Sequence, residues 1–308
     1  MADDREGMGV ETTAGPDHRG LDGFGGLVPT GASARAGETV VCALVVEHYA
    51  DGAAVPLLCL SAAPGVLGID PGSAVRAVDD RGRSYDVDTV TRDAGLGAVQ
   101  ATLWLTPGLP ADARRLELTV ERLTRTSVGR RGGVERPLTD GPWVLVVDLL
   151  PGRTAVEAPA RPRGVRPPPT SPRAPVRTAT AFADVAPIGQ ARVANGIAVC
   201  MWAIERYGDR AVLSLGCLTA DGVEATPLAP GRGTVAVWDD AGMEYSVAPI
   251  HGSAAVAWSE SSLELTPAPP HGATLAIRLA DLPGRARTPE GGWALAGPFI
   301  FGVALPEA

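Results

Sequence analysis

Short runs of alternating apolar residues recur along the whole chain, and no stretch shows the 3.6-residue period of a capped amphipathic helix. Residues 40–49 form the clearest run, because both sides of the alternation are apolar there, as in the central strand of a sandwich. One side carries Val41, Ala43 and Val45, and the other carries Cys42, Leu44 and Val46. Asp51-Gly52 follows as a tight turn and residues 55–59 return, so this segment predicts a β-hairpin.

The rest of the first half of the chain predicts further short strands. They cover residues 75–78, 85–90, 98–105, 116–120 and 143–150, and Gly, Pro or Asp residues separate them. Strands of a parallel α/β sheet would alternate with helices, which this pattern lacks. Six or seven short strands with turn residues between them are typical of an immunoglobulin-like β-sandwich.

The pattern occurs twice. Eleven residues recur without a gap 158 positions later, among them Phe24 as Phe182 and Gly31 as Gly189. Two further blocks recur at a spacing of 160: Asp-Asp-x-Gly-x-x-Tyr from residue 79, and Leu-x-Leu-Thr-Pro-x-x-Pro from residue 103. Gly-Pro-aromatic closes each copy. A duplication of this length predicts two modules of the same fold.

These three motifs, in this order before a last strand, resemble those of immunoglobulin-like modules in uncharacterised bacterial proteins. The resemblance covers nearly all of both copies. It implies the fold, two tandem antiparallel β-sandwich domains, and it implies no activity, cofactor or site residue.

The repeat divides the chain into four parts. Residues 1–21 are polar and Gly-rich, which predicts a disordered tail, and residues 22–151 and 180–308 are the two modules. Residues 152–179 form a linker with six Arg and one Glu, whose proline density predicts an extended, semi-rigid spacer. Pro169-x-x-Pro172 also fits the minimal polyproline ligand pattern. Whether the modules pack on each other stays open.

Composition excludes several classes of function. The net charge of −8 argues against a nucleic-acid-binding surface. All 27 basic residues are arginine, so neither a Schiff-base lysine nor a phosphate-loop lysine exists. No apolar run approaches the ~20 residues that span a bilayer, and the acidic N-terminus is unlike a secretory signal. We therefore expect a cytoplasmic protein without membrane insertion and without a cofactor.

The four cysteines recur as two pairs, Cys42 with Cys59 and Cys200 with Cys217. If each hairpin is centred on its turn, the two sulfurs of a pair face each other across adjacent strands, which allows a disulfide. Cytoplasmic thiols stay reduced, however, which favours four buried thiols that pack as small hydrophobes. A metal site is disfavoured, because no Cys-x-x-Cys and no matching histidine is present.

An acidic cluster, Asp79, Asp80, Asp86, Asp88 and Asp93, suggests a calcium site, but the EF-hand spacing is missing. The second copy keeps Asp239 and Asp240 and has Ser246 and Ala248 in place of the next two acids. The alternative is a solvated hairpin tip whose aspartates bond to local backbone.

Six residues are candidate partner contacts: Glu47, Tyr49, Trp104, Glu205, Tyr207 and Trp238. The Glu-x-Tyr pair recurs at the end of a strand, either as a binding spot on each module or as a tyrosine that caps the core and bonds through its hydroxyl. Trp104 aligns with Glu264 and Trp238 with Val78. An exchange with glutamate indicates a surface or rim position, where an exposed tryptophan would contact a protein or a sugar, and the alternative is a partly buried tryptophan that packs in its module.

We expect a non-enzymatic protein that binds or scaffolds a protein partner with its two modules. Two other classes stay open: a pair of carbohydrate-binding or adhesion modules, and an enzyme with a site in one copy or between the copies. The first requires a row of exposed aromatic residues, and the second requires a pocket with convergent polar groups.

Overall fold

The structure, a computed structural model, describes residues 21–63, 65–69, 75–95, 97–126, 135–137, 141–149, 156–161, 176–220, 223–224, 234–255, 257–280, 282–286 and 293–307. The tail predicted over residues 1–21 therefore lies outside the described residues except for Leu21, and Pro169 and Pro172 lie outside them too. Within these residues the chain is all-β, apart from one 3-10 turn, Leu21–Gly23. The described part contains no helix long and apolar enough to cross a membrane.

The first module is an antiparallel sheet of eight strands. In spatial order they are β1 (Phe24–Ala36), β2 (Thr39–Tyr49), β3 (Ala53–Ser61), β7 (Ala98–Thr106), β6 (Ser84–Gly95), β5 (Val75–Asp79), β8 (Arg115–Val120) and β11 (Trp143–Asp148). A small sheet is added by β10 (Glu135–Pro137), β9 (Leu123–Thr126) and β4 (Val66–Ile69).

The second module repeats this topology strand for strand. Its eight strands are β12 (Phe182–Ala194), β13 (Ile197–Tyr207), β14 (Arg210–Thr219), β18 (Trp258–Thr266), β17 (Glu244–Ala255), β16 (Thr234–Asp239), β19 (Thr274–Ala280) and β22 (Phe299–Ala304). Its small sheet consists of β15 (Val223–Glu224), β20 (Leu282–Ala286) and β21 (Trp293–Ala296). The Thr-Pro and Gly-Pro bonds of the recurring motifs are cis in both modules.

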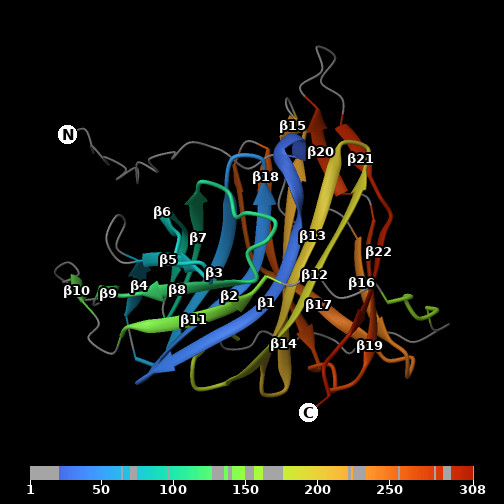
Figure 1. Cartoon of the computed structure of the whole chain (residues 1–308). Helices are drawn as coiled ribbons and strands as arrows, with labels where there is room; N and C mark the ends of the chain where they lie inside the picture. Colours follow the sequence, from blue (N-terminus) through green and yellow to red (C-terminus); the bar gives the residue numbers. More distant parts are fainter. Residues whose placement is uncertain are drawn as a thin grey trace, which may run out of the picture.

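Each module is a nearly closed barrel. The eight strands form one continuous hydrogen-bonded sheet, and the first and last strands, β1 and β11, lie in contact with each other (Figure 1). Apolar side chains fill the inside of each barrel, so each module has a core of its own. The aromatic that follows each closing Gly-Pro lies in that core, with Trp143 1% exposed and Phe299 3% exposed.

The two barrels pack against each other through a third apolar cluster. Outward-facing residues of β2, β3 and β7 meet those of β13, β14 and β18, and β1 runs beside β12 (Figure 1). The cluster includes Cys42, Leu44 and Val45 from one module and Cys200 and Trp202 from the other. Both sides of β2 are therefore apolar because one side fills its own barrel and the other is covered by the second barrel.

Contacts across this interface are reciprocal. A side chain placed on Gly31 would meet Pro187, and one placed on Gly189 would meet Pro29, which are the same two positions of the repeat. A second reciprocal set is polar. Gln100 donates to Ser262 (3.5 Å) and Thr102 donates to Glu260 (3.4 Å), and the repeat spacing of 160 relates these two contacts. Equivalent surfaces that meet in this way define an isologous, pseudo-twofold interface within one chain.

Gly31 tests this interface. Its φ of +57° already disfavours a side chain, and a Cβ would lie 2.8 Å from Cδ of Pro187. Gly31→Ala should lower the free energy of unfolding by about 3 kcal/mol, since strained backbone adds to overpacking. Gly82→Ala is the matched control, because Gly82 has φ +76° with nothing within 4 Å of a Cβ. The control should lose about 1 kcal/mol in urea unfolding; equal losses would contradict the contact.

Candidate functional site

Five of the six predicted contact residues lie between the two barrels. Tyr49, Trp104 and Tyr207 belong to the shared apolar cluster, while Glu47 and Glu205 are fully buried. Trp104 is only 7% exposed and its ring lies 5.1 Å from the ring of Tyr49. The exposure that its alignment with Glu264 suggests is therefore not observed for Trp104. These side chains contact the chain itself.

The Glu-x-Tyr pair of the first module forms one polar centre in the interface. The hydroxyl of Tyr49 donates to Oε2 of Glu47 at 2.9 Å. Nε1 of Trp202, from the second module, donates to Oε1 of the same carboxylate at 3.0 Å. Residues two apart on a strand point to the same side, which is why glutamate and tyrosine meet in each copy. Glu47 thus bonds to both modules at once.

The same pair in the second module binds the linker. Arg177 donates two hydrogen bonds to Glu205, from Nε at 2.8 Å and from a terminal nitrogen at 2.6 Å. Tyr207 and Ser214 also donate to Glu205, at 2.8 and 2.6 Å. The Arg177 side chain is 10% exposed and that of Glu205 is inaccessible. Bidentate geometry and extra donors are what a buried ion pair needs to offset its desolvation.

Burial and charge shift the pKa values in this centre. Burial alone would lower the pKa of Arg177, but attraction to the carboxylate of Glu205 outweighs burial and raises the pKa. The pKa of Tyr207 is well above its ordinary value, first because the hydroxyl is buried and next because Glu205 is close. Both shifts keep the arginine charged and the tyrosine neutral. The arrangement fastens the linker to the interface, and its groups are closed to solvent.

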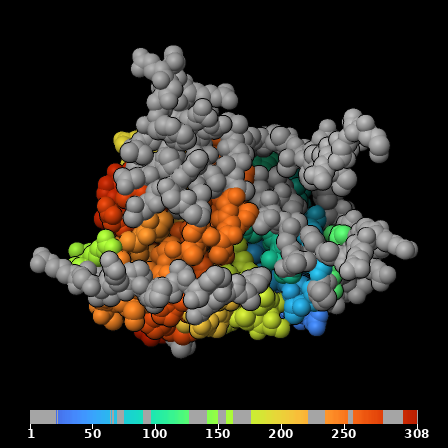
Figure 2. Space-filling view, turned by 180° about the vertical axis from the view of Figure 1, so that it is seen from behind, coloured from blue at the N-terminus to red at the C-terminus, as the bar shows by residue number. Residues whose placement is uncertain are grey.

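Trp238, the sixth predicted contact, lies on the other side of the second module. Trp238 is 4% exposed and its Nε1 donates to the carbonyl of Pro159 at 2.8 Å. Residues 156–161 of the linker cover it, on the side of the second barrel away from the first (Figure 1). Figure 2 shows the same segment in light green against the second module. The described parts of the predicted spacer, 156–161 and 176–179, lie against the folded modules.

All four cysteines are free and buried. Cys59 pairs with Val41 and Cys42 pairs with Leu58, so the two sulfurs of the hairpin point to opposite sides of the sheet. The reason is a β-bulge between Ala43 and Glu47, which shifts the register by one residue from the one set at the turn. Because of the bulge, Val46 lies in the barrel core and Val45 in the interface, the reverse of what strict alternation along the strand predicts.

The second hairpin has the same irregularity. A bulge lies between Met201 and Ala203, and Cys217 pairs with Val199 while Cys200 pairs with Gly216. Cys42 and Cys200 therefore lie in the interface, and Cys59 and Cys217 lie in the two barrel cores. Burial raises the pKa of Cys59 and of Cys217 to about 12, and burial together with nearby Glu205 raises the pKa of Cys42.

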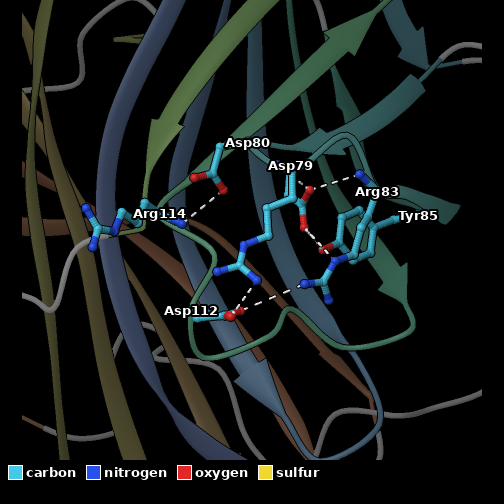
Figure 3. Close-up of polar contacts among 7 residues, drawn as sticks. Asp79, Asp80, Arg83, Tyr85, Asp112 and Arg114 are labelled. Carbon is cyan, nitrogen blue, oxygen red and sulfur yellow. Dashed lines mark hydrogen bonds and ion pairs between the residues drawn. The ribbon is translucent and has the colours of Figure 1, made fainter.

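The acidic cluster is a hairpin cap. Oδ1 of Asp79 accepts the backbone N–H groups of Arg81 and Arg83 at 2.9 Å each, and Oδ2 accepts the hydroxyl of Tyr85 at 2.9 Å (Figure 3). Asp80 accepts the backbone N–H of Arg114 at 3.2 Å. Burial would raise the pKa of Asp79, but these hydrogen bonds and the Arg83 charge lower it. Its carboxylate is thus already saturated with protein donors.

The second module repeats this cap. Asp239 accepts the N–H of Met243 at 2.8 Å and the hydroxyl of Tyr245 at 2.6 Å, and Asp240 accepts the N–H of Thr274 at 3.4 Å. Asp86 and Asp88 point into solvent, and the side chain of Asp93 lies outside the described residues. Among the residues that the structure describes, no three His, Cys, Asp or Glu side chains are grouped so that they could hold a metal ion.

Comparisons with known proteins identify no family. No protein-family model matches the chain, and no curated protein matches it. Among solved structures, the chain is similar to a conserved domain protein from Bacillus anthracis, with 11% identity, 91% of each chain covered and a TM-score of 0.28. It is also similar to the N-terminal periplasmic domain of ScsB from Proteus mirabilis, with 12% identity, 88% of this chain and 94% of that chain covered and a TM-score of 0.21.

Removal of Arg177 tests the linker anchor. Arg177→Met would leave the buried Glu205 carboxylate without its guanidinium, which should lower the free energy of unfolding by about 3 kcal/mol in urea. Arg115→Met is the control, because Arg115 and Asp148 form an exposed pair and should lose less than about 1 kcal/mol. Adding Glu205→Gln to Arg177→Met should recover part of the loss. Equal losses in the two single variants would show that the pair is not buried.

The thiols give a second prediction. A thiolate is the species that reacts, and burial with a raised pKa suppresses it. The native chain at pH 8 should show less than about a tenth of one equivalent reacting with a thiol reagent within minutes. All four cysteines should react after unfolding in guanidinium chloride. Rapid reaction of even one equivalent in the native protein would contradict the placement of these residues.

Proposed function

We propose that the protein is a non-enzymatic scaffold that binds another protein on the outer face of β5, β8 and β11. One observation carries this proposal. Val144 and Val146 on β11 are 44% and 47% exposed, whereas Gly302, which matches Val146 in the second module, is covered by residues 156–161 of the chain. Ile300, which matches Val144, is 46% exposed, so residues 156–161 cover part of the second face. Duplicated modules that share a fold but differ in how far this face is covered support a division of roles between them.

The exposed face has the composition of a small protein contact. Val144 and Val146 are two residues apart on β11 and therefore share one side of the sheet, where Thr119 and Glu117 stand opposite them. Around them lie charged pairs: Arg115 with Asp148, and Arg76 with Glu121. An apolar centre with a charged rim is the usual anatomy of a protein interface. Because the barrels are joined by a buried interface, this face is held in place, which lowers the entropy cost of binding.

A sugar-binding role finds less support. Trp104, Trp143, Trp202, Trp238 and Trp258 are all at most 7% exposed. None of these five rings can stack on a sugar from solvent. The net charge of −8 also favours a protein partner over nucleic acid.

We also propose that the modules are kin to immunoglobulin-like sandwiches and that the protein works in the cytoplasm. β5 and β6 are joined by only two residue pairs, Ala77 with Tyr85 and Val78 with Ser84. Each barrel therefore divides at this point into a five-stranded and a three-stranded part, as a sandwich does. The four free thiols support a reducing compartment.

Affinity capture tests the scaffold. Immobilised full chain should enrich a distinct protein from native lysate, as measured by mass spectrometry. Val144→Glu/Val146→Glu should reduce that protein at least about tenfold, since charge in an interface centre is strongly unfavourable. The control is Val193→Glu/Ile250→Glu, which places the same charges at exposed positions of the second module outside the β22 face, 61% and 40% exposed. Identical capture by all three chains, or by none, would refute the proposed face.

A further inference from the structure

The linker segment Val156–Arg161 occupies a built site on the outer face of β16, β19 and β22. The sequence of this segment is Val-Glu-Ala-Pro-Ala-Arg. We propose that this face is a recognition site for extended peptides of the pattern Ala-Pro-x-Arg, that the linker fills it in cis, and that a protein partner with such a segment displaces the linker. This site is distinct from the β5-β8-β11 face of the first module.

Each part of the segment has its own contact. Ala158 packs against Ala236, Trp238 and Ala276. The carbonyl of Pro159 accepts Nε1 of Trp238 at 2.8 Å. A chain that contains proline is already extended and offers its carbonyls, and aromatic rings with an N–H donor are the side chains that bind such segments.

The arginine adds charge recognition. The guanidinium of Arg161 lies over the ring of Trp238, 5.7 Å from its centroid, and donates to Oε1 of Glu244 at 2.7 Å. The Glu244 side chain is only 10% exposed. One arginine thus makes a cation–π contact and an ion pair with a largely buried carboxylate, and a lysine would not reproduce the planar stacking.

The outer face of β16, β19 and β22 allows the backbone of the segment to approach closely. Val156 pairs with Gly302 through a β-bridge, and a Cβ on Gly302 would overlap the carbonyl oxygen of Val156. Glycine at this position therefore leaves the space that the segment needs. Ala236 and Ala276 beside it are buried under the segment, and their side chains are single methyl groups.

The first module provides an internal comparison. Trp238 pairs with Ala276, which pairs with Gly302, and the matching ladder of the first module is Val78, Glu117 and Val146. At these three places the first module lacks the indole, the small residue and the glycine. The shared fold alone therefore does not create this site. The second module alone carries the residues that fit an Ala-Pro-x-Arg segment.

The same pattern recurs within the linker. Residues 174–177 read Ala-Pro-Val-Arg, and Arg177 binds the buried Glu205. The segment Val156–Arg161 is less buried than Arg177, since the Arg161 side chain is 50% exposed and Val156 is 37% exposed. A tethered segment competes at an effective concentration in the millimolar range, so a partner peptide must bind more tightly than the linker does or engage a second contact.

The test uses the full chain and a fluorescein-labelled peptide with the sequence of residues 154–163. An open variant, Ala158→Gly/Pro159→Ser/Arg161→Ser, empties the face while leaving every residue of the second module in place. Fluorescence anisotropy should give a Kd below about 1 mM for the open variant and at least tenfold weaker binding to the natural chain. In the open background, Trp238→Phe and Glu244→Gln should each weaken binding at least about fivefold.

A peptide in which Glu replaces the residue corresponding to Arg161 should not bind. Absence of binding to the open variant at 1 mM would overturn the proposal, as would equal binding to the natural chain. Unchanged affinity in the Trp238→Phe and Glu244→Gln variants would overturn it too. If the triple variant does not fold, Arg161→Ser alone keeps the apolar contacts and permits the same comparison. Self-association of the open variant with no peptide binding would also overturn it.

Discussion

The packing of one barrel on the other is the constraint on which the rest of this structure depends. The outward faces of β2 and β3 and of β13 and β14 are largely apolar, and neither module can leave such a face in water without cost. Their mutual burial fixes the two barrels as one body. It also explains why the repeat retains residues such as Pro29 and Gly31, which touch their own counterparts across the pseudo-twofold axis.

The two buried glutamates of this interface are stabilised by hydrogen-bond donors. Glu47 and Glu205 would be costly if they were buried alone, but tyrosine, tryptophan, serine and arginine donors surround them. In both copies the tyrosine donates to the glutamate, but a further donor differs: it is Trp202 for Glu47 and Arg177 for Glu205. This difference ties the linker to one side of a symmetric arrangement.

The repeat, the all-strand character and the boundaries of most strands can be predicted from periodicity and turn residues alone. The bulges at Ala43 and Met201 cannot, because nothing in an apolar run marks the extra residue, and this is why the register of the cysteines was wrong by one. Apolar residues on both sides of β2 indicated burial of both sides. They could not say that the second side is covered by another barrel instead of a second sheet of the same sandwich.

Small-angle X-ray scattering of the full chain tests the joined barrels most directly. If the barrels share a buried interface, the radius of gyration should be close to the value of about 20 Å for a compact chain of this length. The distribution of interatomic distances should then have a single maximum. A second maximum, at the separation allowed by an extended linker of up to ~85 Å, would show two independent modules and contradict the account.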